Sequence, residues 1–385
     1  MRIMVAAGTR PEIIKLSPVV RALREEDHNV YVVATGQHAD PAMAAHVFDG
    51  LGYWPDTVWD LPREPGARGG AILANATQEL GRSPGDAVLV LGDTDTAPLV
   101  ALAARRHRIG VIHVEAGLRS FNGHSGEEIN RRVMAATATL NLAPTELAAR
   151  FLFAEGVPAK RVRVVGNPII DVLTESRVPR CALAHRSGIL FTAHRATNVD
   201  QPHRLRTMVR LLGELGRAHG PVTFPVHPRT ERRLAEAGLL GQVTGLDGVH
   251  VCPPLGFHDL LKQLSRSQLV VTDSGGLQEE AAYFGLPVVI MRKTTPRWEG
   301  VQAGTAELCG LDPERVLRSV EHFLQMARLA EVDEVPCPYG TGDAGRRIAA
   351  LLRAASIQEV LTPLECDLDL PGADMLAGVL DGALK

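Results

Sequence analysis

Short apolar, β-branched segments alternate with longer segments of helical period along most of this chain, and this alternation constrains the fold more than any other feature. Strands buried on both faces and joined by crossover helices are typical of a parallel sheet. In the first half the apolar segments span residues 2–7, 29–34, 86–91 and 109–114, with weaker ones at 139–143 and 161–165. Pro11 follows the first of them at a position that suits the first turn of a helix. The pattern predicts an α/β domain.

A second series of the same kind begins past the middle of the chain. Its predicted strands span residues 188–192, 221–226, 248–252, 268–272 and 286–290. A helix after Asp200 places five apolar residues on one face, namely Leu205, Met208, Val209, Leu212 and Leu215. A chain of 385 residues is long enough for two domains with separate cores. We therefore expect two facing, doubly wound, Rossmann-like domains with a crevice at the carboxyl ends of their strands.

The boundary between these domains is predicted in the segment Asp171–Ser187, which has no sustained period and contains a proline. This gives an N-terminal domain over 1–172, a linker over 173–187 and a C-terminal domain over 188–354. We expect residues 166–187 to act as a hinge when the domains close over a substrate. In the tail, residues 355–385, Met375, Leu376, Val379 and Leu380 predict a helix that packs on a domain or on a partner subunit.

Composition excludes several classes of partner. The net charge of −3 gives no electrostatic reason to expect nucleic acid or an anionic membrane. The N-terminal apolar run is too short for a signal peptide and no later stretch is long enough to span a membrane, so we expect a cytoplasmic protein. The five cysteines are scattered without a CxxC pair, which argues against a zinc site or a disulfide framework.

Polar residues collect where the predicted strands end. In the first half these turns are residues 8–12, followed by Lys15, then residues 92–96 and 113–117. In the second half they are residues 192–195, 226–229 and 272–280, and the last has the small residues that suit a phosphate seat at a helix N-terminus.

Each of these residues also has a purely structural interpretation. Asp93 and Ser274 suit helix caps, His113 suits a buried structural histidine, and the Glu127 to Arg132 charges suit solvent-exposed i, i+4 pairs. We favour a site because the polar residues recur at the same predicted sheet edge in both halves. No metal site is expected there, since Asp93 and Asp95 are a close acidic pair that no histidine or cysteine joins.

One glycine-rich motif near the C-terminal end does not indicate a cofactor site. Residues 340–345, GTGDAG, match the GxGxxG pattern of dinucleotide-binding proteins. No predicted strand precedes the motif and no acidic residue follows at the required distance in a βαβ unit, so we do not interpret it as a cofactor site.

As a set, the motifs resemble those of the non-hydrolysing UDP-N-acetylglucosamine 2-epimerases, in the same order from residue 5 to about residue 350. They are GTRPEIIK, GDTDT, HVEAGLRS, EEINRR, APTE, GNPIID, HRATN, FPVHPRT, DSGGLQEEAAYFGLPVVIMR and QAGT. The resemblance implies a glycosyltransferase B type of fold, final helices that rejoin the N-terminal domain, a homodimer and no cofactor. It also implies that UDP is expelled from a UDP-sugar after loss of the C2 proton and is then added back.

The same resemblance implies the site residues. The catalytic positions fall on Lys15, Asp93, Glu115, Glu127, Arg131 and His194. The nucleotide and phosphate positions fall on Arg10, His227, Ser274, Gly275, Gly276 and Glu280, to which Arg297 and Trp298 are added as candidates. The family's TGQH element corresponds to Gly36, Gln37 and His38, in a region that helps bind a second, activating substrate molecule in bacterial members.

The chain departs from the family pattern at four places: Gly126, Thr197, Asp95 and residues 296–298. These departures keep two alternatives open. A glycosyltransferase of the same fold would transfer the sugar to a small acceptor such as a nucleoside, against which Trp298 would stack. A hydrolysing enzyme would let water capture the activated sugar. A non-catalytic sensor fits least, because all six catalytic positions are filled.

Overall fold

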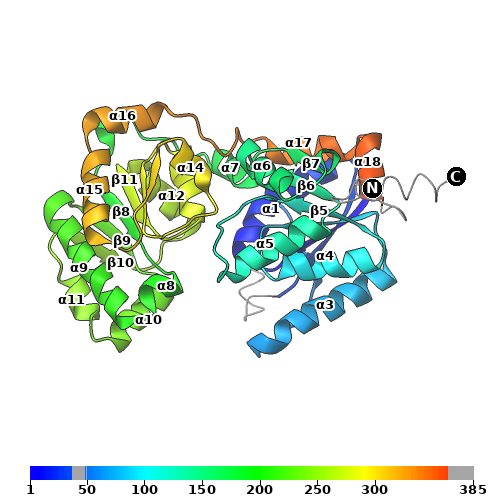
Figure 1. Ribbon diagram of the computed structural model, residues 1–385, viewed down its shortest axis with the longest axis horizontal. Coiled ribbons are helices and arrows are strands. Elements are labelled where there is room, and N and C mark those ends of the chain that lie inside the picture. The colour runs from blue at the N-terminus through cyan, green and yellow to red at the C-terminus, as the bar shows by residue number, and fades with distance from the viewer. Residues whose placement is uncertain (37–47, 49, 363–385) are drawn as a thin grey trace, which may run out of the picture. The chain divides into compact units, whose positions relative to one another are not determined.

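The computed structural model describes residues 1–36, 48 and 50–362, which form two compact units (Figure 1). The first unit comprises Met1–Val172 and the chain from Gly340 onward, and the second comprises Leu173–Tyr339. Both are α/β, as expected. None of the helices within these described ranges is long and apolar enough to cross a membrane.

The first unit contains a seven-stranded parallel sheet in the order β3-β2-β1-β4-β5-β6-β7. Its strands are β1 (Arg2–Ala7), β2 (Asn29–Ala34), β3 (Thr57–Val58), β4 (Ala87–Leu91), β5 (Gly110–Val114), β6 (Leu140–Ala143) and β7 (Val162–Val164). All six strands predicted in this half are present with small differences at their ends. Strand β3 was not predicted, because two residues are too few to show a periodic pattern.

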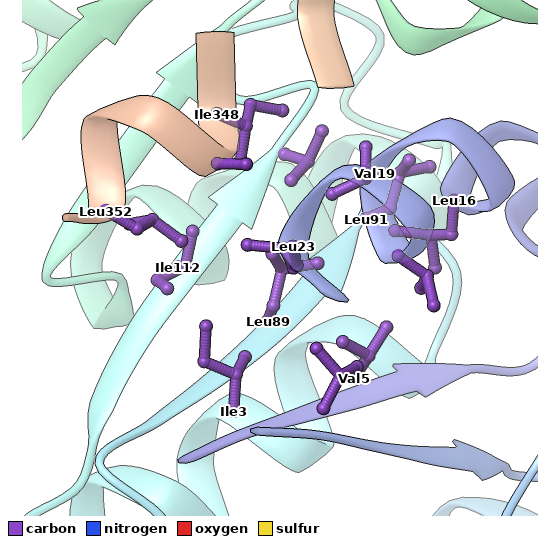
Figure 2. Packing of buried hydrophobic residues seen from close by; sticks show 14 of the residues in the cluster. Ile3, Val5, Leu16, Val19, Leu23, Leu89, Leu91, Ile112, Ile348 and Leu352 are labelled. Carbon is purple, nitrogen blue, oxygen red and sulfur yellow. The ribbon is translucent and has the colours of Figure 1, made fainter. Parts of the chain in front are cut away.

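Helices cover both faces of this sheet. They are α1 (Arg10–Glu25), α3 (Pro65–Arg82), α4 (Thr96–Arg106), α5 (Gly126–Thr137), α6 (Glu146–Ala154), α7 (Pro168–Glu175), α17 (Ala344–Leu352) and α18 (Ala355–Leu361), with a short 3-10 turn at Ala159–Arg161. On one face Leu16 and Leu23 of α1 and Ile348 of α17 pack over Val5 and Leu89 of the strands (Figure 2). Each such buried aliphatic side chain stabilises the fold by about 1.5–3 kcal/mol relative to an exposed one.

The second unit repeats the arrangement with six parallel strands in the order β10-β9-β8-β11-β12-β13. These are β8 (Ile189–Thr192), β9 (Val222–Pro225), β10 (Val249–Cys252), β11 (Leu269–Thr272), β12 (Val288–Ile290) and β13 (Ala306–Leu308). The short β13 was also missed. The helices are α8 (Ala196–Val199), α9 (Pro202–His219), α10 (Pro228–Glu236), α11 (Leu240–Thr244), α12 (Phe257–Arg266), α13 (Gly276–Tyr283), α14 (Trp298–Gln302), α15 (Pro313–Phe323) and α16 (Met326–Glu334), with a 3-10 turn at Leu183–His185.

The five apolar residues predicted on one face of α9 are all buried. Phe191 of β8 and Phe224 of β9 meet edge to face beneath this helix layer, with ring centroids 5.2 Å apart. The 3.6-residue period therefore located the core face of α9 correctly.

The division of the chain differs from the expected boundaries at two places. Residues 173–187, expected as a free linker, belong to the second unit, where Arg186 Nη2 lies 2.7 Å from Asp333 Oδ1. Residues 340–354, expected in the C-terminal domain, belong to the first unit, because α17 packs along α1. Of the expected tail, α18 packs on the first unit through Leu361, and the helix predicted around Met375–Leu380 lies outside the described residues.

The GxGxxG segment starts α17 and has a structural role. The Asp171 carboxylate accepts hydrogen bonds from the backbone N–H of Ala344 (3.1 Å) and Gly345 (2.9 Å), so it takes the place that an anionic ligand would occupy at this helix N-terminus. A Cβ on Gly345 would lie 2.7 Å from the carbonyl oxygen of Pro18. The glycine is there because α17 crosses α1 at backbone contact.

Candidate active site

The order of strands reverses between β1 and β4 in the first sheet and between β8 and β11 in the second. Ligands of doubly wound sheets bind beyond the carboxyl ends of the strands at such reversal points. The predicted polar turns follow these four strands, β5 and β9. The structure therefore brings the predicted residues together in two groups, one within each unit.

In the first unit, Lys15 and Glu115 form a buried ion pair. Lys15 projects from the second turn of α1 and Glu115 from the turn after β5, and each residue is under 10% exposed. Glu115 has a φ of 62°, in the left-handed region that costs a non-glycine residue about 1–2 kcal/mol. Backbone strain of this kind concentrates at functional sites. The turn after β5 therefore holds the Glu115 carboxylate against Lys15 in spite of the strained backbone at Glu115.

A second buried cation connects Asp93 to helix α5. The guanidinium of Arg131 pairs with Asp93 through Nη2 and with Glu128 through Nη1, the latter at 2.8 Å. Glu128 Oε2 also accepts from the backbone N–H (2.7 Å) and the hydroxyl (2.9 Å) of Ser120. Burial alone would raise the pKa of Glu128, but these hydrogen bonds and Arg131 outweigh it and hold that pKa below its ordinary value. Glu128 is thus a fixed anion that orients Arg131.

The other predicted residues of this unit surround that network. Asn130 donates to the backbone oxygen of Asp93 (2.9 Å) and to Oδ1 of the exposed Asp95 (3.0 Å), which accommodates the departure at Asp95. Glu127 lies in the first turn of α5 and accepts from the Ser125 hydroxyl at 2.5 Å. Arg10 is exposed at the first position of α1.

Glu12 was not predicted as a site residue, yet it lies at the centre of the reversal point. Its Oε2 accepts from the backbone N–H of Gly8 (2.6 Å) and Thr9 (3.0 Å), and its Oε1 accepts from the Thr94 hydroxyl. Burial raises the pKa of Glu12 to about 7 against the opposing effect of these hydrogen bonds. Only the capping-box spacing of Thr9 and Glu12 signals this residue in the sequence.

In the second unit, His194 follows β8 and stacks on His227, with ring centroids 5.1 Å apart and an interplanar angle of 29°. His194 Nδ1 lies 3.4 Å from Oδ1 of Asp273, whose fully buried carboxylate also accepts from the backbone N–H of His194 and Arg195, both at 3.0 Å. Burial lowers the pKa of His194, which favours the neutral imidazole. Asp273, which sequence analysis did not single out, fixes the turn that carries the histidine.

The glycine-rich turn after β11 leads directly into α13. Gly275 is the cap residue of that helix, and the Ser274 N–H donates to the Thr272 hydroxyl at 2.9 Å. Arg297 lies against this turn, because a Cβ on Gly275 would be 3.5 Å from its Nη1. The buried Arg297 is oriented by Glu279, which accepts from its Nε at 2.9 Å. A helix N-terminus with a cation beside it suits an anionic group.

The remaining predicted residues of this unit flank the turn. Glu280 is buried within α13, and the half-buried Trp298 is the first residue of α14. Within residues 1–36, 48 and 50–362, no group of three or more His, Cys, Asp or Glu side chains is arranged to hold a metal. Gln37 and His38, from the predicted TGQH element, lie outside the described residues.

Comparison with known proteins gives a consistent result along most of the chain. The sequence profile of the UDP-N-acetylglucosamine 2-epimerase family matches residues 21–353. UDP-N-acetylglucosamine 2-epimerase of Methanocaldococcus jannaschii is 34% identical over 91% of this chain and 99% of the relative. UDP-2,3-diacetamido-2,3-dideoxy-D-glucuronate 2-epimerase of Pseudomonas aeruginosa is 35% identical over 91% of this chain and 99% of the relative. The crystal structure of the M. jannaschii enzyme with UDP-GlcNAc and UDP superposes with a TM-score of 0.82, at 33% identity over 92% of this chain and 99% of that one.

Proposed function

The chain belongs to the UDP-N-acetylglucosamine 2-epimerase family, and we propose that it interconverts UDP-N-acetylglucosamine and UDP-N-acetylmannosamine. The observation that carries this proposal is the set of buried, charge-paired acids and cations at the ends of β1, β4 and β5, in a family that acts on UDP-sugars. In the reaction a base removes the C2 proton and the bond from C1 to the UDP oxygen breaks with its electron pair. The glycal then takes UDP back at C1 and a proton on the other face of C2.

The first unit supplies groups for both proton transfers. Asp93, Glu115 and Glu127 are the candidate acids and bases, since proton transfer by a positioned carboxylate accelerates a reaction about 10²–10⁴-fold. Lys15 and Arg131 hold two of these carboxylates in place, and Arg10 is a cation for the departing pyrophosphate. The charge on UDP grows as the C1–O bond breaks, so fixed cations stabilise the transition state more than the ground state.

The second unit supplies nucleotide contacts. The N-terminus of α13, with Ser274, Gly275 and Gly276, suits the phosphates, and the adjoining Arg297 adds a positive charge. His227 and Glu280 are candidates for contacts to the rest of the nucleotide. His194, neutral and oriented by Asp273, is a donor or acceptor for the leaving phosphate oxygen.

The alternative functions differ in the sugar of the substrate or in the group that attacks C1 after UDP leaves. The P. aeruginosa relative acts on a different UDP-sugar, and the two named substrates share the UDP group and the 2-acetamido group of the sugar. The relatives described above are named as 2-epimerases, which favours epimerisation over transfer to an acceptor bound by Trp298 and over hydrolysis. We propose no cofactor, a homodimer, and action in the cytoplasm; a solution mass of one chain, 41.4 kDa, would contradict the dimer.

Incubation with UDP-N-acetylglucosamine in deuterium oxide tests the reaction. Deuterium should appear at C2 of both UDP-sugars, detected by NMR and mass spectrometry. Asp93→Asn should slow this exchange by about 10²–10⁴-fold, while Glu26→Gln, a surface carboxylate paired with Arg353, should leave it unchanged. An unmodified chain that exchanges no deuterium into UDP-N-acetylglucosamine or its diacetamido-glucuronate counterpart is not a 2-epimerase.

A further inference from the structure

Glu12 occupies an unusual place for a helix-capping residue. It is the third residue of α1 and accepts the N–H of Thr9, the residue before the helix, which is the reciprocal arrangement of a capping box. A capping box itself needs only one acceptor oxygen of the glutamate. Here the residue is only 4% exposed, and both oxygens are engaged.

The second oxygen reaches out of the helix. Oε1 accepts from the hydroxyl of Thr94, which lies in the turn after β4 on the other side of the strand reversal. Thr94 directly follows Asp93, whose carboxylate pairs with Arg131 and whose backbone oxygen accepts from Asn130. One buried carboxylate thus joins the turn that begins α1 to the turn that carries Asp93.

The first oxygen also has a consequence for ligand binding. Oε2 takes the N–H groups of Gly8 (2.6 Å) and Thr9 (3.0 Å), which are donors that a phosphate at this helix N-terminus would need. Glu12 therefore occupies both of these donors, while Arg10 in the same turn has an exposed side chain.

We propose that Glu12 is a positioning residue for the 2-epimerase reaction: through Thr94 it fixes the place of Asp93, and through Gly8 and Thr9 it closes the N-terminus of α1 to substrate phosphate. The expected effect on the rate of epimerisation rests on the proposed function, whereas the effect on the position of Asp93 does not. It assigns no contact between Glu12 and substrate.

Hydrogen-bond chemistry identifies a conservative substitute. Oε2 accepts from the two N–H groups in either protonation state, while Oε1 accepts from Thr94 when Glu12 is ionised and donates to it when protonated. A glutamine at position 12 reproduces the protonated form, with its amide oxygen accepting and its NH₂ donating to the Thr94 hydroxyl. Since burial raises the pKa of Glu12 to about 7, both forms are populated near neutral pH and the geometry does not depend on the charge.

The competing explanation is that Glu12 only caps α1. Thr94→Val separates the two, because valine has the shape of threonine, removes the link to Asp93 and leaves the cap intact. Asp312→Ala is the matched control for lost capping: Asp312 caps α15 in the second unit by accepting from the Arg315 N–H at 3.2 Å. Glu12→Ala removes both the cap and the link, and Glu12→Gln keeps both.

The experiment measures kcat and KM for epimerisation, with the melting temperature of each variant. We expect kcat to fall about tenfold in Thr94→Val and about 100-fold in Glu12→Ala, with KM nearly unchanged, because a shift of about 1 Å in a catalytic group costs up to 10²-fold. Glu12→Gln should stay within about threefold of the unmodified chain, and Asp312→Ala should lower only the melting temperature. A Thr94→Val variant with full kcat, or a Glu12→Gln variant as slow as Glu12→Ala, overturns the proposal.

Crystal structures of the same variants give a readout that needs no activity. In Glu12→Ala and Thr94→Val we expect the turn 93–96 to move and the Asp93–Arg131 pair to open, and in Glu12→Gln neither. If the unmodified chain does not epimerise any UDP-sugar, the proposed function fails, and these structures still decide the positioning role. An unmoved turn in Glu12→Ala refutes it.

Discussion

Replacing Gly345 with alanine should loosen α17 from the first unit. The added Cβ would lie 2.7 Å from the carbonyl oxygen and 2.8 Å from the carbonyl carbon of Pro18, both backbone atoms of α1 that cannot rotate away. Relief to an ordinary contact requires α17 to retreat by about 1 Å, and a gap of that size forfeits a quarter to a half of each dispersion contact. The retreat affects Ile348 and Leu352, which are fully buried against α1 and the sheet (Figure 2).

The net magnitude follows from two opposing effects. Overpacking of this kind costs about 1–3 kcal/mol, and a clash with backbone belongs at the upper end of that range. Alanine recovers up to about 1 kcal/mol of helix propensity. We therefore expect the free energy of unfolding to fall by about 2 kcal/mol, which corresponds to a melting temperature lower by about 4–8 °C for a unit of this size.

Differential scanning calorimetry and urea unfolding measure the effect. Gly70→Ala is the matched control, because Gly70 is an exposed residue within α3 of the same unit and a Cβ there meets nothing within 4 Å. This control should stabilise the protein by about 0.5–1 kcal/mol. If Gly345→Ala is as stable as the unmodified chain, or gains as much as Gly70→Ala, close helix contact is not the reason for glycine at position 345.

Two further predictions concern charge. Arg131→Lys should lower kcat about 100-fold with little change in folding, because a lysine cannot bridge Asp93 and Glu128 as the planar guanidinium does. Steady-state kinetics measure kcat, and circular dichroism checks the folding. A near-normal kcat would contradict the bridging role of Arg131. Glu12→Gln should flatten the pH dependence of stability: the pKa of Glu12 rises from 4.5 to about 7 on folding, so its contribution is full below pH 4.5 and is lost as pH rises through 7. Relative to this variant, the unmodified chain should lose about 3 kcal/mol of unfolding free energy between pH 4.5 and 7.5 in denaturant titrations, and parallel pH profiles would refute the raised pKa.

The strands and the core face of α9 could be predicted from the sequence because their signal is local. Buried β-branched runs in the sequence identify β1, β4 and β5 directly. The short strands β3 and β13 are defined instead by their pairing with the neighbouring strands β2 and β12. Domain membership is a longer-range property. No local sequence pattern shows that Ile348 belongs to the same core as Leu16, because the two residues come from opposite ends of the chain.

In the candidate site, too, some residues have a recognisable sequence signal and others do not. Sequence motifs singled out Lys15, Glu115, Asp93 and Arg131, and the structure joins them in two ion pairs, of which Lys15–Glu115 is buried and Arg131–Asp93 partly buried. The residues that hold these groups in place were missed. Glu12 has a capping-box pattern, and Glu128 has an ordinary i, i+3 spacing to Arg131, so neither sequence signal distinguishes a buried network from a solvent-exposed helix face.

The first unit is discontinuous in the chain, and this bears on synthesis at the ribosome. Its sheet and α1 emerge early, but α17, which covers Leu16 and Leu23, follows only after the whole of Leu173–Tyr339 has been made. At 5–20 residues per second this interval lasts on the order of ten seconds. During it the apolar residues of α1 that share a core with α17 lack that helix, so the inserted unit has time to finish folding before α17 and α18 complete the first unit.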